Sequence, residues 1–338
     1  MKKFTAVLAT LAILSGCAAP RKVVFEPLPM KYGDTTRMSV PFAKDPTVIH
    51  LADRYLMYYS VPPFEKSRLS EAQGETDWGG AIAESRNLVD WTRIGRIDIR
   101  DSEGNPVYGA VAPCVKKFDD GKIHIFYQKR WAPAANNSNI WHAISTDGIT
   151  FNNVSDCPVF IPDTDWSLNR SIDAEVYRVK DKLILMFATR EKTGRIQILG
   201  MAEAPYGTDY GPGKWTLIST DGPFLQPDYP WEGKCIEAPT VIKHKGIWYL
   251  FYAGAYNHER QQIGLCTSTD GIHFTRVSYD PQNPGLVFRA GEKGSWNAGE
   301  SGHPGVFRDD DGQVYLFFQG KASRNANYFL SVCKVSFE

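Results

Sequence analysis

The sequence lacks the features that would place the protein in a membrane or on a nucleic acid. After the first twenty residues it contains no apolar run long enough to span a bilayer. Its 38 Lys and Arg residues balance 38 Asp and Glu residues, and the basic residues form no stripe. Nucleic acids and anionic membrane surfaces are therefore poor candidates as partners, and a neutral partner is expected.

Cysteine is scarce, and its spacing excludes a zinc site. No C-x-x-C pair occurs, and beyond Cys17 the odd number of cysteines permits at most two disulfides in an oxidising compartment. We interpret these residues mostly as small buried apolar side chains. They are Cys114, Cys157, Cys235, Cys266 and Cys333.

The first twenty residues are typical of an export signal. Lys2 and Lys3 precede a short apolar run, and small residues then lead to Cys17. The tetrapeptide LSGC resembles a bacterial lipobox, which implies a lipid on Cys17; a plain signal peptide is the alternative. We therefore expect a signal peptide over residues 1–16 and a flexible lead over 17–30. The mature protein would be lipid-anchored in the bacterial cell envelope, in the periplasm or on the outer-membrane surface, with no other membrane attachment.

A repeat of about sixty residues runs through the rest of the chain. Each unit has a small or polar start, an apolar strand, a short turn and an aromatic-rich strand. Runs of this length and composition, bounded by Gly, Asp and Asn, predict antiparallel strands rather than helices. Five units predict an all-β fold over residues 31–338, a five-bladed β-propeller with four-stranded antiparallel blades around a central channel. A sandwich is the alternative, but it gives no reason for the period.

The first residue of each repeat is expected at one mouth of the central channel, because the innermost strand of a propeller blade lines that channel. Three carboxylates and a histidine would converge there, and like charges at close range push their pKa values apart. Glu237 stands one residue further from its proline than Asp45 does, so we expect its side chain to approach from a shifted direction. The five positions are Asp45, Ala112, Asp173, Glu237 and His303.

These motifs resemble glycoside hydrolase family 43 and its five-bladed propeller relatives over essentially the whole mature chain. The resemblance lies in Asp-Pro at 45–46, Asp173, Glu-x-Pro at 237–239, the strands YLMYYS and WYLFYAG, and the S-x-x-L-V-x-W turn at 85–91. It implies an inverting hydrolase of a plant-type glycan with terminal arabinofuranose, xylose or galactose. Asp45 would be the general base and Glu237 the general acid. Asp173, followed by Ala where relatives often have Pro, would raise the pKa of that acid.

Other residues are candidates for substrate or ion contact. Trp78 and Trp131 could stack on sugar rings, although aromatic residues are also ordinary propeller core. Arg190 and Arg324 follow channel strands and could hydrogen-bond sugar hydroxyls, or pair with neighbouring groups and solvent. The resemblance implies that His303 helps to hold a calcium ion; the alternative is a histidine hydrogen-bonded within the channel. No cofactor is expected to be required. Nearby carboxylates that compete with the proposed set are Glu175, Glu232 and Glu300.

Two other functions stay open at this point. One is a related propeller glycosidase of the anhydro-galactose-releasing type, and the other is a glycan-binding surface lipoprotein without turnover, since a fold alone does not establish function. The fructan-cleaving type is disfavoured, because AKDPT and SIDAE lack its Asn-Asp-Pro and Arg-Asp-Pro motifs. The presence of all three carboxylates favours catalysis over binding alone.

Overall fold

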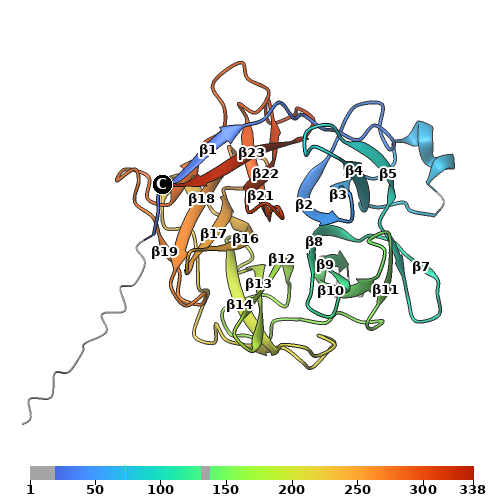
Figure 1. Cartoon of the computed structure of the whole chain (residues 1–338), viewed down its shortest axis with the longest axis horizontal. Coiled ribbons are helices and arrows are strands. Elements are labelled where there is room, and N and C mark those ends of the chain that lie inside the picture. The colour runs from blue at the N-terminus through green and yellow to red at the C-terminus, as the bar shows by residue number, and fades with distance from the viewer. Residues whose placement is uncertain (1–19, 73, 131–137) are drawn as a thin grey trace, which may run out of the picture.

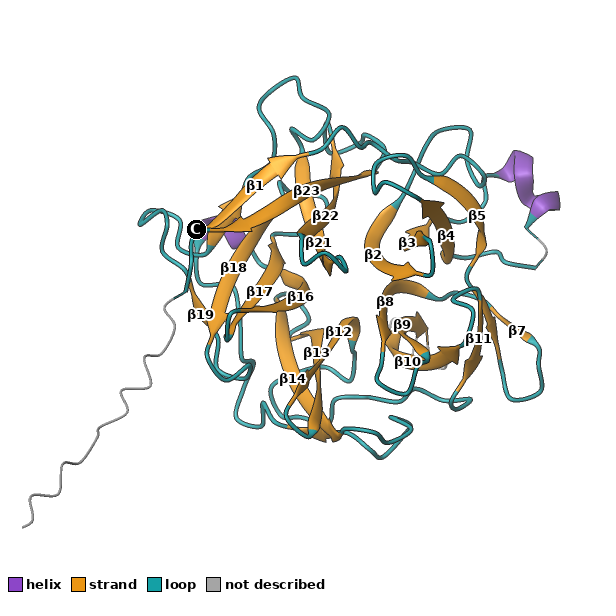
Figure 2. Ribbon diagram, viewed as in Figure 1, coloured by secondary structure: helices purple, strands orange, loops and turns teal. Residues whose placement is uncertain are grey.

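A computed structural model describes residues 20–72, 74–130 and 138–338 of the protein. Within these ranges five β-sheets surround a common centre, which confirms the predicted five-bladed propeller (Figure 1, Figure 2). The predicted signal peptide, Cys17 and Trp131 lie outside the described residues. No helix in the described part of the chain has the length and apolar character needed to cross a bilayer.

Each blade has a core of four antiparallel strands, which follow one another from the centre outward. Blade one contains β2 (Lys44–Leu51), β3 (Arg54–Val61), β4 (Gly79–Ser85) and β5 (Thr92–Arg96). Blade two contains β8 (Val111–Lys117), β9 (Ile123–Arg130), β10 (Ser138–Ser145) and β11 (Thr150–Asn153), extended by β6 (Asp98–Arg100) and β7 (Pro106–Val107). Blade three contains β12 (Ile172–Val179), β13 (Lys182–Arg190), β14 (Gln197–Pro205) and β15 (Thr216–Leu217).

The last two blades complete the ring. Blade four contains β16 (Ile236–His244), β17 (Ile247–Gly254), β18 (Gln262–Ser268) and β19 (Thr275–Arg276), and β20 (Leu286–Phe288) also pairs with β18. Blade five contains β21 (Glu300–Arg308), β22 (Val314–Lys321), β23 (Phe329–Phe337) and β1 (Val23–Pro27). Two short 3-10 helices, η1 (Lys66–Glu71) and η2 (Pro230–Glu232), lie in loops.

The outermost strand of blade five comes from the opposite end of the chain. β1 pairs antiparallel with β23 over its whole length, from Val23 opposite Phe337 to Pro27 opposite Cys333 (Figure 1). The prediction that residues 17–30 form a flexible lead is therefore wrong for the part that contains β1. The physical reason is that β23 would otherwise be an edge with unpaired backbone groups, and the β-prone Val-Val-Phe segment covers it.

We expect Phe25→Ala to lower the free energy of unfolding by about 1–3 kcal/mol, because the ring packs edge-on against Phe251 and Phe288 at centroid distances of 6.2 and 5.1 Å. Denaturant titration would measure the change. Glu26→Ala is the matched control, since Glu26 is the exposed neighbour on the same strand. Equal stability of the two variants would show that β1 adds little to the fold.

The hydrophobic core is divided into layers that lie between neighbouring blades. Along β3, Leu56 and Tyr58 pack in the layer shared with blade two, whereas Met57 and Tyr59 pack in the layer shared with blade five. Successive side chains of a strand point to opposite faces, so a strand between two layers is apolar at every position. This explains the continuous apolar runs in the sequence, such as YLMYYS.

The cysteines fit their interpretation as small apolar residues. Among the described residues no disulfide forms, and Cys114, Cys235, Cys266 and Cys333 are buried, while Cys157 is partly exposed. Burial raises the pKa of the Cys266 thiol to about 12, so this group stays protonated and unreactive.

Candidate active site

The innermost strand of every blade is interrupted near its start by a β-bulge. At each bulge one residue with a side chain adopts the left-handed conformation, which is uncommon for such residues and concentrates at functional sites. A bulge redirects the side chain that it carries. The left-handed residues are Asp45 (φ 55°), Ala112 (46°), Asp173 (50°), Ala238 (49°) and His303 (43°).

Blade four departs from the alignment made from the sequence. Its left-handed residue is Ala238, so the structural counterpart of Asp45 is Ala238 and not Glu237. Glu237 lies one position earlier on β16, where it still pairs with Ala253 of β17. The sequence alignment placed Glu237 at the same repeat position as Asp45, and that alignment is wrong by one residue. The expected shift in the direction of the Glu237 side chain is confirmed, because this side chain leaves the strand before the bulge.

The bulges are held by polar side chains of the preceding blade. The backbone N–H of Asp45 donates to Oε1 of Gln319 on β22, and the N–H of Asp173 donates to Oε1 of Gln128 on β9, both at 3.2 Å. These bonds satisfy backbone donors that the bulge removes from the sheet. The carboxylates at the mouth are thus fixed in position before any ligand arrives.

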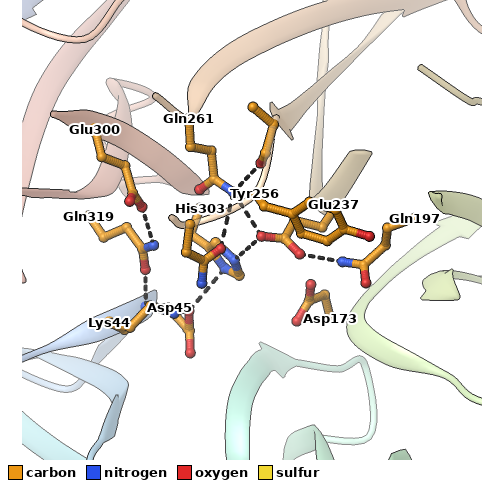
Figure 3. A network of polar contacts seen from close by, with 12 residues as sticks. Lys44, Asp45, Asp173, Gln197, Glu237, Tyr256, Gln261, Glu300, His303 and Gln319 are labelled. Carbon is orange, nitrogen blue, oxygen red and sulfur yellow. Dashed lines mark hydrogen bonds and ion pairs between the residues drawn. The ribbon is translucent and has the colours of Figure 1, made fainter. Parts of the chain in front are cut away.

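His303 lies between two carboxylates at the centre of the mouth (Figure 3). Its Nδ1 is 2.9 Å from Oδ1 of Asp45, and its Nε2 is 3.0 Å from Oε1 of Glu237. Burial alone would lower the pKa of His303, but the two carboxylates outweigh it and hold the pKa well above its usual value. The ring is therefore an imidazolium in the resting site.

The carboxylate of Glu237 receives further hydrogen bonds. Nε2 of Gln261 donates to Oε1 at 2.7 Å, and Nε2 of Gln197 donates to Oε2 (Figure 3). Burial would raise the pKa of Glu237, but the charge and hydrogen bond of His303, the charge of Lys44 and the hydrogen bond from Gln261 lower it below its usual value. Asp45 is held even more firmly as an anion, because Lys44 and His303 lower its pKa against the effect of burial.

Asp173 has the opposite electrostatics. It is buried, and its Oδ2 has no hydrogen-bond partner. Burial raises its pKa, and the charges of Glu237 and Asp45 add to this against the charge of His303, which brings the pKa to about 6. In the resting site it is the pKa of Asp173, and not that of Glu237, that is raised. Asp173 keeps its proton to a higher pH than Glu237 does, because it lacks the imidazolium contact that Glu237 has.

The competing glutamates have structural partners elsewhere. All three are buried, and each accepts from a cation that compensates its charge within the framework. None of them lines the pocket that contains Asp45, Asp173 and Glu237. The pairs are Glu175 with Lys116 at 2.9 Å, Glu232 with Arg276 at 2.9 Å, and Glu300 with Lys321 at 3.3 Å.

A pocket of roughly 610 Å³ opens above the three carboxylates. Arg190 and Arg324 both line it, as the sequence predicted for channel-strand arginines. Its size is that of ordinary small-molecule sites, and its lining is unusually polar for one. The pocket therefore fits a hydroxyl-rich ligand of one or a few sugar units.

A second cavity of roughly 680 Å³ adjoins the first and shares Lys44, Asp45 and Gln128 with it. Trp78 lines this cavity with 38% of its surface exposed, and its ring is backed edge-on by Phe42 at 5.6 Å. A braced, exposed indole suits a platform for a sugar ring. Trp131, the other predicted platform, lies outside the described residues.

The comparison of sequences decides the family. The family model for glycosyl hydrolases family 43 matches residues 39–333, which is most of the chain. The chain belongs to glycosyl hydrolase family 43. A search of curated proteins gives no match.

Solved structures agree with the family 43 fold. A thermostable family-43 glycoside hydrolase is 20% identical over 91% of this chain and 93% of its own, with a TM-score of 0.67. An α-L-arabinofuranosidase from Podospora anserina, solved with cellotriose, is 13% identical over 94% and 97%, with a TM-score of 0.63. A xylan β-1,4-xylosidase from Bacillus halodurans is 18% identical over 93% and 55%, with a TM-score of 0.61. At these identities the likeness shows the fold alone.

Calcium binding by His303 of this family 43 chain would compete with the contacts that its ring makes. Ligand atoms of Asp173, Glu237 and His303 lie within 4.8 Å of one another. However, both ring nitrogens of His303 face carboxylates, so a metal would have to take the place of one of these contacts. Calcium also prefers six to eight oxygen ligands. The geometry favours the alternative of a histidine held within the channel by its carboxylate neighbours.

The sequence missed the glutamines that bind Glu237. A weak signal for them exists, since RIQIL (195–199) and RQQIG (260–264) both place glutamine after an arginine near the start of a third strand. The two glutamines differ by one position in this alignment, because Gln262 and not Gln261 is the counterpart of Gln197. Lys44 and Arg170 also line the pocket and were not singled out.

We expect Asp173→Asn to stabilise the protein by about 2–3 kcal/mol at pH 8 and to change little at pH 4. The raised pKa of Asp173 means that its protonated form favours folding at low pH, and that this contribution is lost as the pH rises from about 4 to about 6. Asparagine avoids the ionisation and tolerates the left-handed backbone. Asp45→Asn is the control and should destabilise at pH 8, because the pKa of Asp45 is lowered. Denaturant titrations at both pH values would measure the change in the free energy of unfolding. The same change at pH 4 and pH 8 for Asp173→Asn would contradict the raised pKa of Asp173.

Proposed function

We propose that this family 43 hydrolase inverts anomeric configuration and acts on a plant-type glycan or its oligosaccharides with terminal arabinofuranose, xylose or galactose. Asp45 acts as general base and Glu237 as general acid, with Asp173 as the third carboxylate. One observation carries the proposal. Two carboxylates contact opposite nitrogens of a single buried imidazole, next to the floor of a pocket of sugar size.

The spacing of Asp45 and Glu237 supports inversion. The two carboxylates are separated by the imidazole ring of His303 and by contacts of 2.9 and 3.0 Å on its two sides. Inverting enzymes keep their carboxyl groups about 6.5–9.5 Å apart to admit a water, whereas retaining enzymes have a separation of about 5–5.5 Å. A whole ring between the groups agrees with the larger spacing.

The protonation states support a base at Asp45 and supply the proton that Glu237 needs. Asp45 is anionic across the neutral range and can accept a proton from water. Glu237 is an anion at rest, but two proton donors adjoin it: His303, hydrogen-bonded at 3.0 Å, and Asp173, with a pKa of about 6. When a substrate displaces water, the anionic form of Glu237 becomes less favourable. Glu237 then takes up a proton from one of these two neighbours and can act as the acid.

The substrate class is supported by two features. The pocket combines many hydrogen-bonding side chains with an adjoining cavity that presents Trp78. The Podospora arabinofuranosidase and the Bacillus xylosidase share the fold of this chain, and both act on pentose glycosides according to their names. Terminal arabinofuranose and xylose are accordingly the first sugars to test.

The test uses nitrophenyl arabinofuranosides, xylosides and galactosides, followed by natural oligosaccharides, with NMR detection of the first-formed anomer. We expect hydrolysis of at least one of them with inverted configuration. Product of retained configuration would exclude the water-activating role of Asp45. Tight binding of oligosaccharides without any turnover would instead favour a glycan-binding lipoprotein.

We also propose that Cys17 carries a lipid that anchors the protein in the cell envelope, because the LSGC motif precedes it. The test is incorporation of a labelled fatty acid into the wild type and into Cys17→Ala, with separation of membrane and soluble fractions. Label in the membrane fraction of the wild type only is expected. Equal labelling of the two proteins would overturn the proposal.

A further inference from the structure

Two arginines of blade three line the pocket without an acidic partner. Arg190 is the last residue of β13, and Arg170 lies in the loop that leads into β12. Among the described residues neither guanidinium makes an ion pair within 4 Å, and Nε of each is buried without a hydrogen-bond partner. The side chain of Arg170 makes one hydrogen bond, a long one of 3.4 Å to Oε1 of Gln197.

The two arginines are fixed relative to each other by the backbone. The N–H of Leu168 donates to the carbonyl of Arg190, and the N–H of Arg170 donates to the carbonyl of Leu168, both at 2.8 Å. The hydroxyl of Thr189 also donates to the carbonyl of Leu168 at 3.1 Å. The guanidiniums therefore reach the pocket from one rigid unit. Burial, followed by the charge of Arg190, lowers the pKa of Arg170, and the charges of Asp173 and Glu237 oppose this without outweighing it.

The anions of the pocket compensate this pair only in part, since none forms an ion pair with either guanidinium although the charges of Asp173 and Glu237 act on Arg170. Asp45 and Glu237 already share the imidazolium of His303, and Asp173 retains a proton up to a pH of about 6. Partly buried charges of one sign are unfavourable unless a counter-charge accompanies them. The balanced composition of the chain suggested a neutral partner, but this part of the pocket has an excess of positive charge.

We propose that Arg170 and Arg190 form an anion subsite that binds the carboxylate of a uronic acid residue in the glycan. The inference rests on the proposed function, since the anion belongs to a sugar bound in the same pocket. A guanidinium presents a planar fork of donors that matches the two oxygens of a carboxylate. Nε is one of the donors that form this fork, and it is the atom that stands unpaired in both arginines. Neutral hydroxyls would satisfy the hydrogen bonds but would leave both charges uncompensated.

The test compares binding of D-galacturonic acid and D-glucuronic acid with binding of D-galactose and D-glucose, measured by calorimetry at low ionic strength. A charged hydrogen bond discriminates by about 10- to 100-fold, so at least one acid should bind tighter than its neutral parent by that factor. Arg170→Gln and Arg190→Gln should each remove most of the preference, and the double variant all of it. Arg170→Lys and Arg190→Lys, which keep the charge but lose the fork, should keep part of it.

Arg178→Gln is the matched control, because Arg178 is an exposed arginine of the same blade that pairs with Asp119 outside the pocket. Its preference should equal that of the wild type. Equal affinity for acid and neutral sugars, no measurable binding of either acid, or a preference that survives in the double variant would overturn the subsite. Tighter binding of D-galactose 6-sulfate than of either acid would indicate that the arginines bind sulfate esters. It would overturn the proposal that they bind a uronic acid carboxylate.

Monosaccharides are not hydrolysed, so this measurement is independent of turnover. An acid preference that depends on the arginines, in a protein that hydrolyses nothing, would support the subsite and count against the proposed function. Hydrolysis of neutral glycosides by a protein that does not prefer acid sugars would support the proposed function and count against the subsite. Thermal unfolding of each variant checks folding, and removal of one of two like charges is expected to leave the fold intact.

Discussion

Glu237→Gln is expected to lower kcat by about 10²–10⁴-fold, because the amide cannot donate a proton to the leaving oxygen. The shape of the side chain is kept, so substrate binding should change far less than turnover. The decisive measurement compares two leaving groups in steady-state kinetics. A dinitrophenolate leaves without protonation, whereas the hydroxyl oxygen of a sugar leaving group must be protonated. The loss of kcat should therefore be small with a dinitrophenyl glycoside and large with an oligosaccharide.

The matched control for this substitution is Glu203→Gln, since Glu203 pairs with Lys182 on blade three and does not line the pocket. Its kinetics should equal those of the wild type. A loss at residue 237 that is the same for both leaving groups would show that Glu237 positions the substrate and does not donate the proton. Full activity of Glu237→Gln would place the acid elsewhere.

His303→Ala is expected to lower the free energy of unfolding by about 3–5 kcal/mol near neutral pH, because it leaves two buried carboxylates without the cation that they share. The raised pKa of His303 means that its contribution is fully present below about pH 6.5 and is lost as the pH rises through the folded value. The lowered pKa values of Asp45 and Glu237 mean that the contribution of these carboxylates to the free energy of unfolding is present above about pH 4 and is lost as the pH falls. The deficit of the variant should therefore shrink toward pH 3.

Denaturant titrations at pH 3, 5 and 7 would measure this dependence. His273→Ala is the control, because His273 is exposed and pairs with Asp270 at the surface, where ion pairs contribute little. A deficit for His303→Ala of under about 1 kcal/mol, or one that does not vary with pH, would show that the three groups do not act as one ion cluster.

The repeat predicted the blades because each unit carries its own strand and turn signals, and the structure confirms this interpretation. The place of β1 could not be predicted in the same way. Val23 to Pro27 form one short strand whose partner lies about three hundred residues away, and no local pattern records such a pairing. The offset of Glu237 was visible as one extra residue before its proline, but only the position of the left-handed Ala238 shows what it means.

The electrostatics of the site were less accessible to sequence reasoning. Asp45, Asp173, Glu237 and His303 were all found from the repeat, and the structure brings all four to one mouth. Which carboxyl holds a proton depends on which of them contacts the imidazolium, and that is a matter of side-chain distances. Arg170 was missed for a similar reason, because it lies in a loop outside the repeated strands and becomes notable only beside Arg190.

The early start of the folded region shortens the tether that a lipid on Cys17 would provide. The N–H of Arg21 donates to the hydroxyl of Tyr249 at 2.9 Å, and the hydroxyl of Tyr279 donates to the carbonyl of Arg21 at 3.2 Å. Only four residue steps then separate the lipidated residue from the blades, a reach of about 14 Å when fully extended. If Cys17 carries the lipid proposed above, so short a tether would hold the propeller against the bilayer surface.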